Sequence, residues 1–353
     1  MWRRCLSTLN YSDALKRTRL KHAISVAPMV DITNAHFLEL LHIVAGQERY
    51  AYYTEMHPPH VITKNPDTLY AILGAPRPNV VVQLGGSDPQ HMAQAAEILE
   101  RQGYSEININ VGCPSAAVKA GDFGAVLMKT PEKVVAVLRE MQSAVSIPIT
   151  VKCRLGVDDL DTYEFLHRFV DTIISQSKRE LPHLIVHARK CILKGLTPKQ
   201  NRNVPQLNYD RVYRLAQDMK HLPISINGGF KDPTAIQDAL QRVDGCMIGR
   251  QIMNNPLFLQ TLDTTIYNVP NKSVLQVIRE YIDYGTSLES HPAYSKHRLP
   301  PLTILTKPLT MMFGGQQGRA FRRELQQELR RPEQGLDRVV TNALVNAGIL
   351  LSM

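Results

Sequence analysis

The stretch "EININVGCPS", residues 106–115, decides the fold. Apolar and polar residues alternate from Ile107 to Val111, which is the pattern of a β-strand. Gly112-Cys113-Pro114 should end that strand and begin a loop. A thiol therefore stands where a strand stops. Whether it takes part in chemistry or only fills space depends on what the rest of the chain forms around it.

Seven further short runs are similarly rich in β-branched and apolar residues. Several are nearly continuous apolar runs, as strands buried on both faces require. Together with the first stretch they give eight predicted strands, within residues 23–30, 49–56, 79–86, 106–113, 147–156, 183–189, 222–229 and 245–250.

Amphipathic helical stretches separate these runs. Asp88-Pro89 opens one and Asp232-Pro233 opens another, each with a capping residue followed by proline at the first turn. Asp161 with Glu164 predicts a capping box. Eight such units in a row predict an α/β fold, a closed (β/α)8 TIM barrel over residues 23–265. The alternative, an open doubly wound sheet, would need a glycine-rich fingerprint after the first strand, which "APMVDIT" (27–33) lacks.

Residues 272–353 change character, with helical periodicity and no strand signal, and predict a separate all-helical domain. The formal net charge of +9 is concentrated at the two ends of the 353-residue chain. Residues 1–22 carry six Lys/Arg against one Asp, and residues 272–353 carry eleven Lys/Arg against seven acids. Clustered positive charge favours a polyanionic partner.

Residues 1–22 are rich in arginine and poor in acids, and they lack the long apolar stretch of a secretory signal. This composition is typical of a mitochondrial transit peptide and predicts a mitochondrial protein, with a basic arm on a cytoplasmic protein as the alternative. Five cysteines without a CxxC pair indicate a reducing compartment rather than a zinc site. The sequence contains no run of 18 apolar residues, so no transmembrane helix is predicted.

In a barrel of this kind, the carboxyl-terminal ends of the strands surround the active site. Backbone N–H groups after the seventh and eighth strands often bind phosphate, and glycines let a ligand approach the backbone closely. Gly228-Gly229 and Gly249-Arg250 occupy these places, which predicts a phosphate-bearing cofactor. The strand ends carry Pro28, Met29, Glu55, Gln83, Asn110, Cys113, Lys152, Arg154, His187, Arg189, Asn227, Gly228, Gly229, Gly249 and Arg250.

Several of these residues have simpler explanations. Lys152, inside an apolar strand, could form a Schiff base, lie beside an anionic ring, or pair with Glu55. His187 could be a core histidine, and Gln83 could cap a strand. Cys153 is expected to fill the core, as is Cys246.

The motifs as a set resemble the tRNA-dihydrouridine synthases, and among them the A subgroup. Further marks of that subgroup are "VDDLDTYEFL" (157–166) and the insertion at 193–213. We expect the similarity to run from about residue 23 to about residue 330. The motifs are "APMVDIT", "QLGGSDP", "EININVGCPS", "GDFGAVLM", "VKCRLG", "HARK", "SINGGF" and "MIGR".

The resemblance implies a barrel that binds FMN, which NADPH or NADH reduces, and a helical domain that binds tRNA. A cation near the pyrimidine part of the flavin, here Lys152, favours the anionic reduced form. By motif match, the residues that hold FMN are Pro28, Met29, Gln83, Lys152, His187, Asn227, Gly228, Gly229, Gly249 and Arg250.

The implied reaction reduces uridine to 5,6-dihydrouridine in the D-loop of tRNA, at position 20 or 20a. Flavin would deliver hydride to C6, and Cys113 would supply the proton to C5. A general acid must be protonated at neutral pH, as an ordinary thiol with a pKa of about 8.5 is. We therefore expect no lysine or histidine adjacent to this sulfur. The uridine must be flipped out of the folded RNA to reach the barrel.

By the same match, Asn110 contacts the target nucleotide, and Lys199, Arg202, Arg319 and Arg322 contact tRNA. Arg319 and Arg322 are three residues apart and should share a helix face.

The sequence also departs from the family. Arginines are expected near Ala35 and Leu38, so a phosphate or flavin contact there would be missing or displaced. Residues 57–66 also differ from the segment that follows the second strand in the family.

Two other functions stay open. One is an FMN oxidoreductase of the dihydroorotate dehydrogenase kind acting on a free pyrimidine, which would not need a basic helical domain. The other is a non-catalytic RNA-binding or assembly factor, which would have no use for Cys113 and Lys152. We expect a monomer without a metal and without membrane insertion.

Overall fold

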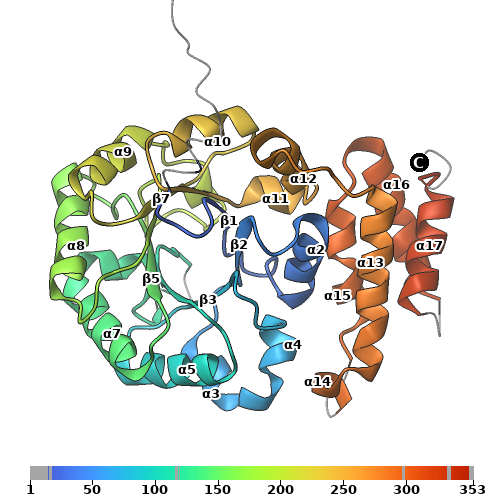
Figure 1. Cartoon of the computed structure of the whole chain (residues 1–353), viewed down its shortest axis with the longest axis horizontal. Helices are drawn as coiled ribbons and strands as arrows, with labels where there is room; N and C mark the ends of the chain where they lie inside the picture. The colour runs from blue at the N-terminus through green and yellow to red at the C-terminus, as the bar shows by residue number, and fades with distance from the viewer. Residues whose placement is uncertain are drawn as a thin grey trace, which may run out of the picture.

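The computed structural model describes residues 15, 18–115, 118, 120–295, 299–331 and 335–349. Eight parallel strands pair in sequential order and close into a barrel, which confirms the predicted fold (Figure 1). Each predicted run contains one strand. The strands are β1 (Ile24–Val26), β2 (Tyr50–Tyr53), β3 (Val80–Leu84), β4 (Ile107–Val111), β5 (Ile149–Arg154), β6 (Leu184–His187), β7 (Ile224–Asn227) and β8 (Gly245–Ile248).

Helices surround the barrel and form the region beside it (Figure 1). In the described part of the chain, none is long and apolar enough to cross a membrane. Around the barrel lie α2 (Ala35–Ala45), α3 (Pro59–Lys64), α4 (Leu69–Leu73), α5 (Pro89–Arg101), α7 (Pro131–Ala144), α8 (Tyr163–Gln176), α9 (Tyr209–Asp218), α10 (Pro233–Leu240), α11 (Arg250–Asn254) and α12 (Phe258–Leu262). The carboxyl-terminal region contains α13 (Val274–Ser287), α14 (Pro292–Ser295), α15 (Leu302–Thr306), α16 (Gly315–Glu328) and α17 (Leu336–Asn346).

Short helical turns complete the structure. The 3-10 turns are η1 (Pro66–Thr68), η2 (Gly124–Lys129), η3 (Gln200–Arg202), η5 (Leu288–Ser290) and η6 (Pro308–Met311), and η4 (Asp263–Tyr267) is a π-helical turn.

Side-chain caps fix where the helices begin. Asp88 accepts a hydrogen bond from the His91 amide, and Asp232 caps α10 in the same way, so both predicted caps are confirmed. The predicted capping box at Asp161 is wrong. Thr162 caps α8 instead, because the helix begins one residue later. The Asp161 carboxylate accepts from Arg211 at 2.5 Å, which lies 50 residues away.

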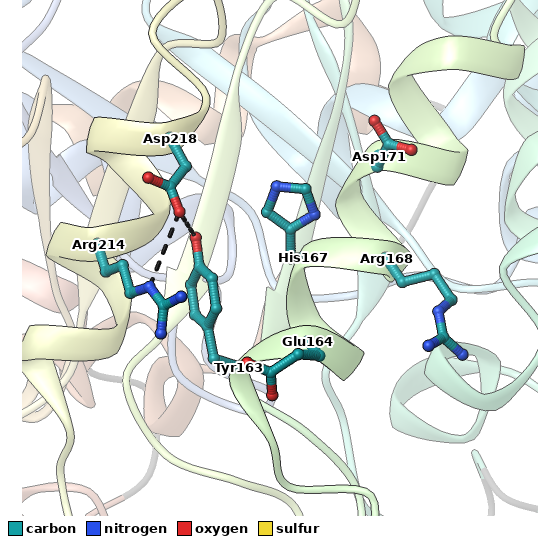
Figure 2. A pocket seen from close by; sticks show the side chains of 7 residues that line it. All are labelled: Tyr163, Glu164, His167, Arg168, Asp171, Arg214 and Asp218. Carbon is teal, nitrogen blue, oxygen red and sulfur yellow. Dashed lines mark hydrogen bonds and ion pairs between the residues drawn. The ribbon is translucent and has the colours of Figure 1, made fainter.

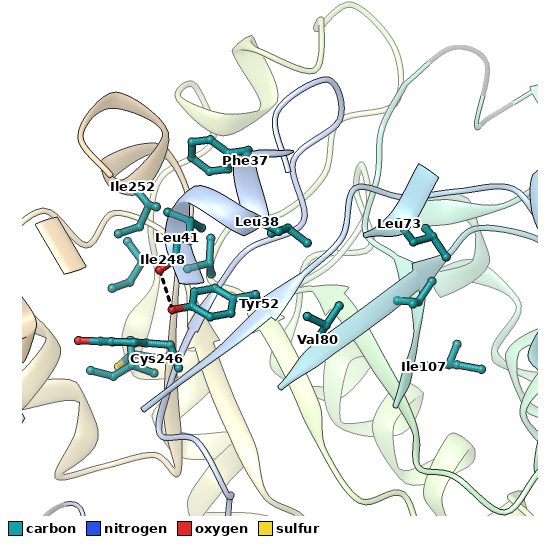
Figure 3. Packing of buried hydrophobic residues seen from close by; sticks show 14 of the residues in the cluster. Phe37, Leu38, Leu41, Tyr52, Leu73, Val80, Ile107, Cys246, Ile248 and Ile252 are labelled. Carbon is teal, nitrogen blue, oxygen red and sulfur yellow. Dashed lines mark hydrogen bonds between the residues drawn. The ribbon is translucent and has the colours of Figure 1, made fainter. Parts of the chain in front are cut away.

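The core has two layers. Inside the barrel, a small cluster is formed around Tyr53 and Met247, and a larger layer lies between the strands and the helices. Figure 3 shows the larger layer near α2, where the Tyr52 hydroxyl donates to the Leu41 carbonyl at 3.3 Å. Ala35 and Leu38 are 5% and 3% exposed and belong to this core.

The helical region joins the barrel beside α2 (Figure 1), where α13 packs against α2. The Tyr284 hydroxyl lies 2.8 Å from His36 Nδ1. The Lys307 ammonium donates to the Asp31 carbonyl at 2.7 Å, in the loop between β1 and α2. The helical region therefore contacts the loop that follows the first strand, at the carboxyl-terminal end of the barrel.

The amino-terminal segment meets the opposite end of the barrel. Arg19 donates to the Asp244 carboxylate at 2.8 Å and to the Leu222 carbonyl at 2.9 Å, just before β8 and β7. The Thr18 hydroxyl donates to the Asp244 carbonyl at 2.6 Å. Thr18 and Arg19 thus contact the barrel, although both precede the boundary that we placed after residue 22. Most of the predicted transit peptide, residues 1–14, 16 and 17, lies outside the described residues.

A buried carboxylate ties the bottom of β2 to η4. Asp263 is 2% exposed and accepts from Arg49 Nε at 2.7 Å and from the Tyr50 hydroxyl at 2.8 Å. Arg49→Met would leave this carboxylate buried without its cation. We expect the free energy of unfolding in urea to fall by about 3 kcal/mol.

The matched control is Arg214→Met, which removes an exposed pair with Asp218 at 3.8 Å and should cost about 0–1 kcal/mol. Equal losses in the two variants would contradict the role given to Asp263.

Candidate active site

The structure brings the predicted strand-end residues together. Asn110 pairs with Lys152 across the β4–β5 ladder, and His187 pairs with Asn227 across the β6–β7 ladder. A Cβ on Gly249 would lie 3.6 Å from the Met29 sulfur. We name the following set the strand-end ring: Pro28, Met29, Gln83, Asn110, Cys113, Lys152, His187, Asn227, Gly228, Gly229, Gly249 and Arg250.

Exposure separates Cys113 from the other cysteines. Cys153 and Cys246 are fully buried, as predicted, and so is Cys191. Cys113 is partly exposed, the only such cysteine among the described residues. Filling the core therefore explains Cys153 and Cys246 but does not explain Cys113.

Hydrogen bonds fix the peptide that carries this thiol. Asn110 Oδ1 accepts from the amides of Gly112 at 3.0 Å and Cys113 at 2.9 Å. The Cys113 carbonyl accepts from the Ala125 amide at 3.0 Å, and the Gly112 carbonyl accepts from Arg154 Nε at 2.8 Å. All four main-chain polar groups of residues 112 and 113 are therefore bonded, and the thiol is attached to a rigid support.

Gly124, in the motif "GDFG", is required by this support. Its φ of +72° lies in the left-handed region, and a Cβ there would lie 2.7 Å from the Cys113 carbonyl oxygen. No larger residue allows η2 to approach the Cys113 loop this closely.

A buried chain of side-chain hydrogen bonds orients Asn110. Its Nδ2 donates to Gln83 Oε1 at 2.8 Å, and Gln83 Nε2 donates to Asn108 Oδ1 at 2.8 Å. Asn108 in turn donates to the Thr150 hydroxyl at 3.0 Å. Gln83 thus does more than cap a strand, because it fixes the amide that holds the Cys113 loop. The predicted nucleotide contact of Asn110 would use its remaining N–H.

The strand-end ring and the arginines next to it carry positive charge without ion-pair partners. In the described part of the chain, no ion pair is formed by Lys152, Arg154, Arg189, Arg202 or Arg250. The alternative that Lys152 pairs with Glu55 is wrong, since the Glu55 carboxylate accepts from the Asp31 amide at 2.7 Å. Such uncompensated charge favours an anionic ligand.

Burial and these charges alter the titration of two ring residues. Burial, and then the nearby Arg154 guanidinium, lowers the pKa of Lys152 to about 8. Burial and the surrounding cations lower the pKa of His187 well below its ordinary value. At neutral pH, His187 is therefore uncharged and can offer a ligand a hydrogen bond but no positive charge.

We expected no lysine or histidine adjacent to the Cys113 sulfur. Among the described residues, no hydrogen bond joins its sulfur to a lysine or histidine. At longer range Lys152 lies within electrostatic reach, because Cys113 is one of the groups that raise the pKa of Lys152.

Lys199 and Arg202 lie in the insertion and are exposed, on either side of the buried Asn201. Arg250 Nη2 donates to the Arg202 carbonyl at 3.1 Å and also binds the side chain of Asn203. Arg250, predicted to bind flavin phosphate, therefore also attaches the insertion to the barrel.

Two further arginines attach the insertion, and both were predicted to lie at strand ends but were given no role in binding or catalysis. Arg154 Nη1 donates to the Asn201 carbonyl at 3.1 Å, and Arg189 Nη1 donates to the Asn203 carbonyl at 3.4 Å. Their position at the ends of buried strands was the available signal. The carbonyl groups that they bind are distant in the sequence, so no sequence signal pointed to these contacts.

Arg319 and Arg322 are exposed on α16, three residues apart as predicted. Arg322 Nη1 donates to the Thr310 carbonyl at 3.1 Å, and neither arginine is hydrogen-bonded to the strand-end ring. The structure thus places these two residues on the helical region. Lys307, which reaches the Asp31 carbonyl, is a cation of this region that we did not predict as part of the site.

A groove between α8 and α9 lies on the flank of the barrel (Figure 2). The Tyr163 hydroxyl donates to Asp218, and the Arg214 guanidinium lies 3.7 Å from the centre of the Tyr163 ring. These groups satisfy one another, and none comes from a strand end. The groove is therefore not part of the candidate active site.

The sequence matches the dihydrouridine synthase family over residues 25–347. The match extends beyond residue 330, where we expected the similarity to end, and so includes most of the helical region. Among curated proteins, the chain is 39% identical over 307 residues to the tRNA-dihydrouridine(20/20a) synthase of Salmonella typhimurium, covering 86% of this chain and 89% of that protein.

The chain is 40% identical over 349 residues to the protein of the same name from Xanthomonas axonopodis pv. citri, covering 96% of this chain and 98% of that protein. It is 38% identical over 340 residues to the protein of the same name from Yersinia pestis, covering 96% of this chain and 95% of that protein. The chain therefore belongs to the dihydrouridine synthase family.

Proposed function

We propose that this chain reduces uridine to 5,6-dihydrouridine in tRNA, at positions 20 and 20a of the D-loop, with FMN as cofactor and NADPH or NADH as reductant. The observation that carries the proposal is the Cys113 thiol, which is partly exposed at the end of β4 on a peptide held by hydrogen bonds. The named activity of relatives at 38–40% identity supports the substrate and the positions.

The strand-end ring fits a flavin phosphate. Lys152 makes no hydrogen bond or ion pair with another described residue, and Arg189 Nε is buried without a partner. Gly228 and Gly229 have φ of +118° and +82°, and a Cβ on Gly229 would lie 2.7 Å from the Tyr209 hydroxyl. Lys152 would face the anionic part of the ring system, and the glycine backbone with Arg250 would bind the phosphate. When bound, the flavin supplies the hydride that C6 of uridine receives.

The chain's own part in the chemistry is the proton. Reduction at C6 leaves negative charge at C5, which an acid must protonate, and a thiol is normally protonated at neutral pH. Cys113 is partly exposed and supported by a fixed peptide, whereas Gln83 and Asn110 have no acidic proton to donate. Asn110 holds the thiol in place through the amides of residues 112 and 113.

The remaining task is to hold a folded RNA with one base turned out. Phosphate contacts spread over a wide surface serve this purpose. Lys199 and Arg202 in the insertion and Arg319 and Arg322 on α16 are exposed cations on two separate parts of the molecule. We infer that they bind the tRNA backbone, and that the chain works as a monomer without a metal. No group of three or more metal-binding side chains gathers in the described part of the chain.

Replacing Cys113 by alanine tests the role of the thiol. Cys113→Ala should keep FMN, keep its affinity for tRNA, and still be reduced by NADPH, because none of these needs the thiol proton. Dihydrouridine formation, measured by mass spectrometry of digested tRNA, should fall by roughly 10²–10⁴-fold.

Arg319→Ala combined with Arg322→Ala is the contrasting variant. It should weaken tRNA binding and reduce its salt dependence while flavin reduction stays intact. Wild-type dihydrouridine formation by Cys113→Ala would show that another group protonates C5.

The pKa of Lys152 predicts how FMN binding depends on pH. Its ammonium is charged below about pH 8 in the empty site and loses its proton above that value. The Kd for FMN, measured by fluorescence quenching, should be constant near pH 7 and should rise as the pH passes through about 8. The FMN phosphate stays fully ionised over this range, so its titration does not contribute to the rise. Lys152→Met should bind more weakly at pH 7 and lack this step. A wild-type Kd that is flat to pH 9.5, together with unchanged binding by Lys152→Met at pH 7, would exclude Lys152 as a flavin contact.

We also propose that the amino-terminal residues direct the protein to mitochondria. Their arginine-rich and acid-poor composition supports this. Residues 1–22 fused to a fluorescent protein should enter mitochondria, and replacing Arg3, Arg4 and Arg17 with glutamine should abolish import. Uniform cytosolic fluorescence of the unaltered fusion would refute the proposal.

A further inference from the structure

Arg154 is the last residue of β5, and its buried guanidinium has unusual partners. The residue is 3% exposed and forms no ion pair with a described residue. Instead it donates to three carbonyl oxygens, those of Gly112 at 2.8 Å, Lys190 at 3.1 Å and Asn201 at 3.1 Å. A buried cation normally needs a carboxylate, so the fixed fork of the guanidinium is used here to join three segments of main chain.

Two of these segments have functions in the proposed reaction. Gly112 directly precedes Cys113, and Asn201 lies between Lys199 and Arg202 in the insertion. The other hydrogen bonds that support residues 112 and 113 come from Asn110 and Ala125. Among the hydrogen bonds to residues 112 and 113, only the one from Arg154 comes from a side chain that also binds the insertion.

We propose that Arg154 is a positioning residue that holds the Cys113 loop at a fixed distance from the insertion, so that tRNA bound by the insertion presents its uridine to the thiol. This rests on the function proposed above. Arg154 itself touches neither uridine nor flavin in this role, and it acts through Cys113.

The other attachments of the insertion separate this role from tRNA binding. Arg189 and Arg250 bind the carbonyls of Asn203 and Arg202 independently of Arg154. Loss of Arg154 therefore leaves the insertion attached to the barrel by Arg189 and Arg250, and also by the bonds from Tyr209 to the Gly228 carbonyl and from Arg211 to Asp161. Removal of Arg154 should therefore displace the Cys113 thiol more than it displaces Lys199 and Arg202, the cations of the insertion.

The experiment compares Arg154→Met with the wild-type protein loaded with FMN. The rate at which tRNA reoxidises the reduced flavin in a single turnover should fall by about 10²-fold, the usual effect of a misplacement of about 1 Å. The Kd for tRNA should change by no more than about threefold, and NADPH should reduce the flavin at the wild-type rate.

The matched control is Arg179→Met. Arg179 also donates to two carbonyls, those of Ser146 at 2.9 Å and Val145 at 2.7 Å, but it lies at the amino-terminal side of β5. This variant should leave the reoxidation rate unchanged. Arg154→Lys, which keeps the charge but cannot span three carbonyls, serves if Arg154→Met does not fold, and it should also slow reoxidation without weakening tRNA binding.

A double-mutant cycle decides whether Arg154 acts through the thiol. In the Cys113→Ala background, Arg154→Met should cost no more than about threefold, because the group that it positions is already absent. The same 10²-fold loss in both backgrounds, or a Kd for tRNA raised about 10²-fold, would overturn the proposal. Wild-type protein that forms no dihydrouridine would overturn the proposed function itself, whereas an active wild type with additive losses overturns only the role of Arg154.

Discussion

The pair of hydrogen bonds from Asn110 Oδ1 to the amides of Gly112 and Cys113 is the interaction on which the site depends. These bonds turn the chain at the end of β4, so the thiol is directed by the barrel and not by a free loop. The amide can face this way only because its Nδ2 is held by Gln83, which is itself held by Asn108. A buried polar chain of this kind favours one geometry, because each of these side chains is hydrogen-bonded to the next.

The second constraint is charge. Lys152, Arg154, Arg189 and Arg250 lie at neighbouring strand ends, and no carboxylate among the described residues forms an ion pair with them. At an effective dielectric constant of 20, two like charges 8 Å apart repel by about 2 kcal/mol, so this arrangement costs stability. Neutral carbonyls hold three of the cations in position without cancelling their charge. The positive potential is thereby kept for a phosphate-bearing cofactor and for RNA.

The strands were predictable because strand burial leaves a local signal, and the caps at Asp88 and Asp232 were predictable because each acts within three residues. The capping box at Asp161 failed because two adjacent residues could cap α8, and the distant Arg211 engages the first of them. Arg154 reaches carbonyls 42 and 47 residues away, and a carbonyl acceptor has no residue identity in the sequence. The strand-end ring could therefore be found from spacing and resemblance, whereas the means of holding the insertion could not.

The helical region meets the same site from the opposite side of the barrel mouth. Lys307 donates to the Asp31 carbonyl, and the Asp31 amide donates to Glu55, so one residue joins the helical region, the β1–α2 loop and the end of β2. Asp31 has a φ of +63°, in the left-handed region that is uncommon for residues other than glycine and asparagine or aspartate. The same loop carries Met29, whose amide donates to the Thr33 hydroxyl at 2.9 Å. The region that carries Arg319 and Arg322 is thus fastened directly to a loop of the strand-end ring, and a shift of one must displace the other.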